Sequence, residues 1–226
     1  MLQDKISARI NIGHAGPRMK TKELLKLRQD HARAVDAVWS FVDEEKVEKL
    51  GFKKVQTLVS DKEEYIVRPD KGRRFCDETI EEIKKTCILN PTVQILVADG
   101  LSSPAIDANL NDIYNILIDG FKHKNIKVGT PIYIKYGRVA VMDYISEALN
   151  AKVTILLVGE RPGLATGESM SAYMAYESSP NKPESQRTVV SNIHKNGLYP
   201  VEAGAQIIHI TEIMLEKKIS GVDLKI

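Results

Sequence analysis

The chain has 226 residues, 43% of them hydrophobic, which is enough for a buried core in one large or two modest domains. Thirty-two basic residues against thirty acidic ones give a formal net charge of +2, which excludes the strongly basic surface typical of nucleic-acid-binding proteins. No apolar run approaches the roughly 20 residues of a membrane span, and no signal-peptide core follows Met1. We therefore expect a cytoplasmic protein with neither a nucleic acid nor a membrane as partner.

The first fifty residues combine an irregular segment with a helix. Residues 10–18 are rich in glycine and proline but apolar at the start, which indicates an irregular segment docked on another surface. With Thr21 as N-cap, a helix is expected to about Trp39, with Leu24, Leu25 and Val35 among the residues of its apolar stripe. A shorter helix over 47–50 is expected to end at Gly51.

Beyond residue 50, strand and helix patterns alternate. Strands are expected over 55–59, 64–68, 93–98, 131–136, 153–158 and, after a change of rhythm, 169–176 in the antiparallel sense, followed by a short apolar segment over 187–193. Helices are expected from about 73 to before Pro91, over 103–125 with Ser103 as N-cap, over 142–149 and over 200–218. This alternation predicts an α/β fold with a mostly parallel, Rossmann-like sheet flanked by helices, preceded by an irregular and helical N-terminal segment.

The most apolar strand ends in the sequence Gly159-Glu160-Arg161-Pro162-Gly163. Ligands of open α/β sheets bind at such strand ends, and glycines let the backbone approach them closely. Two further glycine-bearing loops follow the strands over 93–98 and 131–136. Glu160 is then either a ligand contact or a local partner of Arg161 or the backbone that only holds the loop.

The sequence lacks the common signatures of catalytic and metal sites. It has no Gly-x-Gly-x-x-Gly after a strand, no Walker loop and no Gly-x-Ser-x-Gly elbow, and its five histidines show no metal-ligand spacing. Cys76 and Cys87, about 16 Å apart on one helix, are too far apart to bridge, and we expect buried free thiols. We predict no catalytic or metal-binding residue, and loops better suited to holding a large ligand than to transforming a small one.

Several short motifs occur together and in a characteristic order. They are Gly16-Pro17-Arg18, Arg68-Pro69-Asp70, Gly72-Arg73-Arg74, Asp99-Gly100-Leu101-Ser102, Lys127-Val128-Gly129-Thr130-Pro131, Tyr136-Gly137-Arg138-Val139, Gly159-Glu160-Arg161-Pro162-Gly163-Leu164 and Ser191-Asn192-Ile193-His194. In this combination the chain resembles, over nearly its whole length, the small (light) subunit of ethanolamine ammonia-lyase.

The resemblance implies a subunit of an adenosylcobalamin-dependent enzyme that converts ethanolamine to acetaldehyde and ammonia. It implies that the cofactor lies between this chain and a large barrel subunit that carries the substrate site, within a bacterial microcompartment. The family's cofactor contacts carry over to Val139, Glu160 and Val189. Because relatives can have cysteine where Val189 stands, an apolar or backbone contact is expected there.

The resemblance also divides the chain into an N-terminal part over 1–50 that packs on the large subunit and a cobalamin-binding α/β domain over 51–226. No Asp-x-His-x-x-Gly pattern is present, so the cofactor should keep its own lower base on cobalt. Two other classes remain open: a nucleotide-binding α/β domain of another enzyme, which would need a phosphate-binding glycine loop, and a non-catalytic scaffold subunit.

Overall fold

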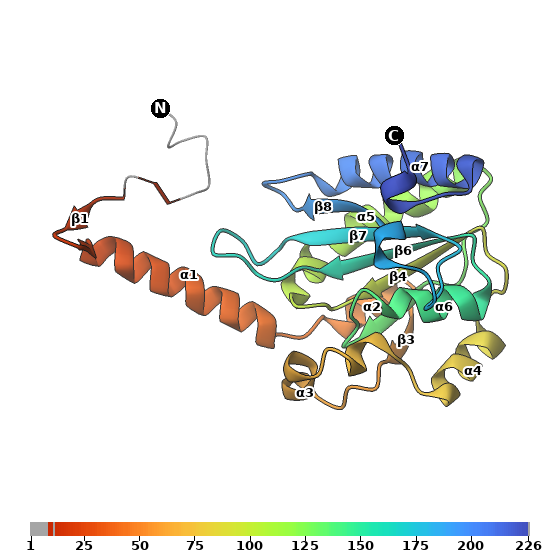
Figure 1. Ribbon diagram of the computed structural model, residues 1–226, viewed down its shortest axis with the longest axis horizontal. Coiled ribbons are helices and arrows are strands. Elements are labelled where there is room, and N and C mark those ends of the chain that lie inside the picture. The colour runs from red at the N-terminus through yellow and green to blue at the C-terminus, as the bar shows by residue number, and fades with distance from the viewer. Residues whose placement is uncertain (1–8, 11, 226) are drawn as a thin grey trace.

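The computed structural model describes residues 9, 10 and 12–225, and its centre is a six-stranded sheet (Figure 1). The strands, in spatial order, are β3 (Lys53–Gln56), β5 (Ile132–Lys135), β4 (Val93–Ala98), β6 (Val153–Gly159), β7 (Met170–Tyr176) and β8 (Thr188–Ile193). The first four are parallel, whereas β7 and β8 are antiparallel to their neighbours. The predicted mostly parallel sheet, with an antiparallel strand over 169–176, is confirmed.

Helices cover both faces of this sheet. One core cluster joins the sheet to α2 (Glu44–Lys49), α5 (Ser103–His123) and α7 (Pro200–Lys217), and another joins its opposite face to α4 (Asp77–Thr86) and α6 (Val141–Leu149). In β4, Ile95 and Val97 belong to the first cluster, while Leu96 belongs to the second. Because successive strand residues point to opposite faces, a continuous apolar run is what a strand buried on both faces requires.

The first helix, α1 (Thr21–Trp39), projects from one end of the α/β body, and a short hairpin of β1 (His14–Ala15) and β2 (Arg18–Met19) lies at its far end (Figure 1). Its bounds were predicted, but its N-cap is Lys20 instead of Thr21, and residues 10–18 include strand pairing where an irregular segment was expected. The predicted apolar stripe is largely exposed, with Leu25 at 59%. No described part of the chain covers that stripe.

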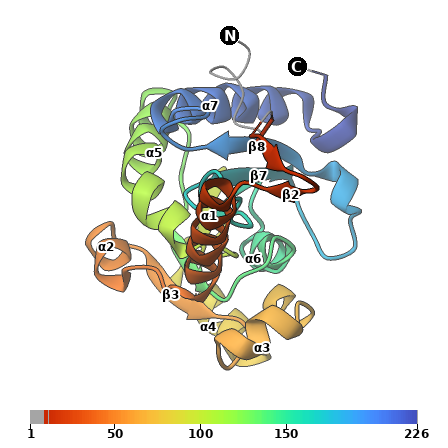
Figure 2. The same cartoon turned by 90° about the vertical axis from the view of Figure 1, so that its left-hand side faces the viewer.

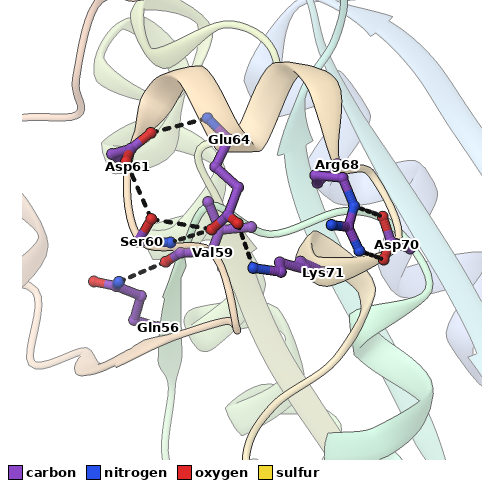
Figure 3. A network of polar contacts seen from close by, with 8 residues as sticks. All are labelled: Gln56, Val59, Ser60, Asp61, Glu64, Arg68, Asp70 and Lys71. Carbon is purple, nitrogen blue, oxygen red and sulfur yellow. Dashed lines mark hydrogen bonds and ion pairs between the residues drawn. The ribbon is translucent and has the colours of Figure 1, made fainter.

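The predicted strand over 64–68 is wrong, because these residues belong to α3 (Lys62–Val67). The Asp61 side chain caps the helix by accepting the Glu64 N–H at 2.9 Å, and the Glu64 carboxylate accepts the Ser60 N–H at 2.9 Å (Figure 3). Lys71 also pairs with Glu64, and this hydrogen bond is the main reason that the pKa of the Glu64 carboxyl falls to about 2. Local capping chemistry outweighs the strand preference of the β-branched residues that follow.

Smaller differences concern element ends. The first strand of the body covers 53–56, earlier than the predicted 55–59, and the N-cap of α5 is Ser102 instead of Ser103. Arg73 closes a 3₁₀ turn, η2 (Lys71–Arg73), so the paired arginines lie before α4 and not in its first turn. Both cysteines are free as expected, but Cys76 is exposed. The final 3₁₀ turns are η3 (Glu184–Gln186) and η4 (Gly221–Asp223).

Candidate functional site

Three loops meet at the carboxyl edge of the parallel strands. They follow β4, β5 and β6, which lie side by side in the sheet. The loop after β4 leads to α5 on one face, whereas the loop after β5 leads to α6 on the other. Neighbouring strands whose connections diverge in this way form the crevice in which α/β proteins bind ligands. Helix α1 and the β6–β7 loop project from this same end (Figures 1 and 2).

Asp99, the first residue after β4, links two of these loops. Its Oδ1 accepts the backbone N–H of Gly100 at 3.0 Å and that of Gly137, in the loop after β5, at 3.1 Å. The side chain is buried, and this burial raises the pKa of the Asp99 carboxyl to about 6, although Lys62 and the backbone N–H groups oppose the shift. Asp99 thus fixes the start of the loop that carries Val139.

Two glycines allow the loops after β4 and β6 to touch. Gly100 adopts a φ of +60°, a conformation that side chains rarely permit, and the Leu101 N–H bonds the Gly159 carbonyl at 3.0 Å. A Cβ on Gly159 would lie 2.6 Å from the Asp99 carbonyl oxygen and still closer to that of Ser102. Close backbone packing at this edge therefore requires glycine at position 159.

The long β6–β7 loop, residues 160–169, is anchored to α5. The Ser102 hydroxyl donates to the Gly167 carbonyl, and Asn109 Nδ2 donates to the Glu168 carbonyl at 2.8 Å. Ala37, in the last turns of α1, packs beside Gly167. The loop is thus held in place on the side of the molecule where α1 projects.

The structure places two of the three predicted cofactor contacts, Val139 and Glu160, at this edge, whereas Val189 lies opposite Tyr173 on β8, level with the middle of β6. Val139 is partly buried in the loop between β5 and α6, Glu160 is the first residue after β6, and Val189 on β8 is 44% exposed. The Glu160 N–H donates to the Ser169 carbonyl at 3.0 Å, and its carboxylate accepts the Tyr173 hydroxyl at 3.0 Å. Among the described residues Arg161 forms no ion pair with Glu160, so the side-chain partner of the Glu160 carboxylate is Tyr173 of β7 and not Arg161.

Two cationic side chains, the buried Lys62 and the half-buried Arg138, lie beside the same edge. The Lys62 ammonium is buried with no hydrogen-bond partner in the described part of the chain, 5.5 Å from the Phe41 ring centre, and burial lowers the pKa of Lys62, against the effect of Asp99. Arg138, directly before Val139, donates to the Tyr65 carbonyl at 2.7 Å and stacks on the Tyr65 ring at 4.1 Å. The contacts between Arg138 and Tyr65 fasten the loop after β5 to α3.

A second buried network holds the β7–β8 connection. The Asp143 carboxylate, in the first turn of α6, accepts the Ser178 hydroxyl and Arg187 Nη2, the latter at 2.6 Å. The Arg187 and Asp143 side chains are only 9% and 6% exposed. Since Arg187 directly precedes β8, this pair fixes the start of that strand and therefore the position of Val189.

Grooves also occur elsewhere on the described surface. One, of about 440 Å³, lies between the end of α1, residues 165–168 and Lys195, and another, of about 270 Å³, lies between α2 and α5. Neither is lined by Val139, Glu160 or Val189. Within residues 9, 10 and 12–225, no cluster of three or more histidine, cysteine or acidic side chains could hold a metal ion, and no helix is long and apolar enough to cross a membrane.

The sequence alone did not reveal Asp99 as a link between loops or Tyr173 as the partner of Glu160. A usable signal for Tyr173 was the alternation over 169–176, which places Ser171, Tyr173 and Ala175 on one face of a strand. Its partner cannot be read from that pattern, because it depends on the register between β6 and β7.

The fold and this edge define a class: an α/β protein with a mostly parallel sheet, whose strand-end loops are rigidly held by backbone contacts and present few acids or bases. A family model described as ethanolamine ammonia-lyase light chain (EutC) matches residues 1–225. The chain therefore belongs to the ethanolamine ammonia-lyase light chain family, and so to the subunits of a lyase.

Curated relatives support this membership. The chain is 62% identical over 219 residues to the ethanolamine ammonia-lyase small subunit of Clostridium acetobutylicum, covering 97% of this chain and 90% of the relative. It is 52% identical over 224 residues to that of Clostridium perfringens, covering 99% and 76%, and 50% identical over 218 residues to that of Listeria monocytogenes, covering 96% and 74%.

Proposed function

We propose that this chain is the small subunit of an adenosylcobalamin-dependent ethanolamine ammonia-lyase and helps to hold the cofactor against a large catalytic subunit. The observation that carries the proposal is the juxtaposition of Glu160, a partly exposed carboxylate, with accessible apolar surface at the strand-end edge of a chain of this family. The enzyme would convert ethanolamine to acetaldehyde and ammonia, and the large subunit would supply the substrate site.

The residues at this edge, together with Val189 on β8, suit a corrin. Its wide faces are apolar and its rim carries amides, so a seat for it needs apolar contacts and a few strong acceptors. Val139 and Val189 offer the apolar contacts, and Glu160 offers a carboxylate acceptor. When bound, adenosylcobalamin would supply the radical chemistry of the reaction. This chain would contribute binding and orientation only, and we propose that it has no catalytic or metal-ligating residue.

The surface at the projecting end suits a partner chain. Leu24, Leu25 and Trp39 of α1 are 36%, 59% and 46% exposed, and Leu164 in the β6–β7 loop is 37% exposed. Apolar residues gathered on one end of a protein mark interaction surfaces. We propose that residues 1–50 and the strand-end loops pack on the large subunit, that residues 51–226 form the cobalamin-binding domain, and that the assembly resides in a bacterial microcompartment.

The test is a spectroscopic titration of adenosylcobalamin into the mixture of this chain with a large subunit. Glu160→Gln keeps the shape of the side chain but removes its charge, so the loss of a charge-assisted hydrogen bond should weaken affinity by roughly ten- to a hundredfold. The melting temperature of the free chain should change little. A lowered melting temperature with unchanged affinity would assign Glu160 to the loop scaffold.

The non-catalytic scaffold remains the second candidate. If the chain is only a scaffold, the subunits associate, but removing this chain leaves the affinity of the large subunit for cobalamin unchanged. Turnover of ethanolamine by this chain alone with adenosylcobalamin would contradict the proposed division of labour. Separate elution of the two subunits at micromolar concentration, with cofactor present, would contradict the proposed interface.

A further inference from the structure

Tyr173 connects the proposed cofactor contacts to one another. It lies on β7, directly opposite Val189 in the register of β7 and β8, so the two side chains share one face of the sheet. Its hydroxyl reaches the Glu160 carboxylate at 3.0 Å, and its ring packs on the same core cluster as Val139. No other described side chain hydrogen-bonds the Glu160 carboxylate.

The direction of this hydrogen bond is determined by protonation. Burial, followed by the negative charge of Glu160, raises the pKa of the Tyr173 hydroxyl to about 12, so it remains a donor at neutral pH. A phenol has one proton to donate, and it is used on Glu160 Oε1. A carboxylate has two oxygens and about four acceptor positions, so most of the acceptor capacity of Glu160 stays available to a ligand.

We propose, resting on the proposed function, that Tyr173 is a positioning residue that holds one oxygen of Glu160 and aims the other at the cofactor rim, selecting a neutral amide over a carboxylate there. An amide N–H can donate to the aimed oxygen. A carboxylate at the same point would set two negatively charged acceptors against each other, with no proton between them.

A purely structural role would also explain the contact, since Tyr173 could merely tie the β6–β7 loop to β7. The two roles differ in selectivity. A loop tie affects folding and all ligands alike, whereas a positioning residue affects the discrimination between an amide and an acid, and acts only while Glu160 is present.

The experiment uses the complex of this chain with the large subunit and two probes, hydroxocobalamin and its separated monocarboxylic acids, in each of which one peripheral amide is hydrolysed. Tyr173→Phe retains the ring and removes the hydroxyl. The control is Tyr144→Phe, because Tyr144 packs on the same cluster and its hydroxyl has no hydrogen-bond partner among the described residues. Affinities come from the change in the visible spectrum, and melting temperatures are measured on the free chain.

For the wild type we expect one of the acids to bind at least tenfold more weakly than hydroxocobalamin. Tyr173→Phe should weaken hydroxocobalamin binding about tenfold, the value of one hydrogen bond. It should also reduce the ratio of the affinities for hydroxocobalamin and for that acid. Tyr144→Phe should change neither. In a Glu160→Ala background, Tyr173→Phe should have no further effect on affinity.

Unchanged affinity and discrimination in Tyr173→Phe would overturn the inference while leaving the proposed function intact, provided that Glu160→Gln still weakens binding. An equal loss of affinity in the Glu160→Ala background would likewise overturn it, because Tyr173 would then act independently of Glu160. Absence of cobalamin binding by the wild-type complex would overturn both the inference and the proposed function.

Discussion

Replacing Asp99 with asparagine tests how the strand-end loops are held together. Asparagine keeps an oxygen at the position of Oδ1, which accepts the Gly100 and Gly137 N–H groups at 3.0 and 3.1 Å, but it cannot ionise. The variant should therefore fold with both loops in place. The substitution removes the pH dependence of folding stability that comes from the buried carboxyl group.

The magnitude follows from the pKa of Asp99, which burial raises from 3.8 to about 6. Below pH 3.8 the carboxyl is neutral in the folded and the unfolded chain. As the pH rises, the unfolded chain loses this proton first, so the folded state binds more protons and its stability falls until about pH 6. The shift of about two units, at about 1.4 kcal/mol each, amounts to about 3 kcal/mol.

Urea unfolding of the wild type and of Asp99→Asn between about pH 4 and pH 7 measures this contribution. The free energy of unfolding of the wild type, minus that of the variant, should fall by about 2 kcal/mol across this range, because part of the total is already lost at pH 4. A constant offset from the new amide cancels in this comparison. Asp119→Asn, at an exposed position of α5, controls for the loss of one negative charge. A difference that stays flat across the range would refute the assignment of the cost to burial of Asp99.

Three further predictions follow from the packing. Gly159→Ala should lower the free energy of unfolding by about 1–3 kcal/mol or more, because its Cβ would overlap the Ser102 and Asp99 carbonyls, whereas Gly163→Ala, with no atom nearer than 3.7 Å, should be nearly neutral in the same urea titration. Arg187→Met should lower the free energy of unfolding by about 3–5 kcal/mol, because it leaves the buried Asp143 carboxylate without its cationic partner. Adding Asp143→Asn should restore part of that loss, and an additive double variant would contradict the pairing. Leu25→Asp on α1 should weaken association with the large subunit in gel filtration without changing the melting temperature of the free chain. Lys26→Gln, an exposed position on the side of α1 away from the apolar stripe, changes the net charge by the same amount and is its control.

The patterns that depend on neighbouring residues were sufficient for most of the fold. The apolar run Val93–Ala98 defines a strand buried on both faces, and the spacing of Ala203, Ile207, Ile210 and Met214 predicts the buried side of α7, which is confirmed. Such elements are decided within a few residues, by side-chain periodicity and capping. The strand wrongly predicted over 64–68 was also decided locally, because the capping pair of Asp61 and Glu64 that starts α3 is itself visible in the sequence.

The contacts that shape the candidate site are of another kind. Asp99 lies 38 positions from Gly137, and Glu160 meets Tyr173 only because β7 runs antiparallel to β6 in one particular register. The exposed stripe of α1 could not be distinguished from a buried one either, since amphipathic periodicity is the same whether a helix packs on its own chain or on a partner. Sequence periodicity determines which face of an element is apolar, but only the tertiary arrangement decides what that face meets and which buried carboxylates find donors.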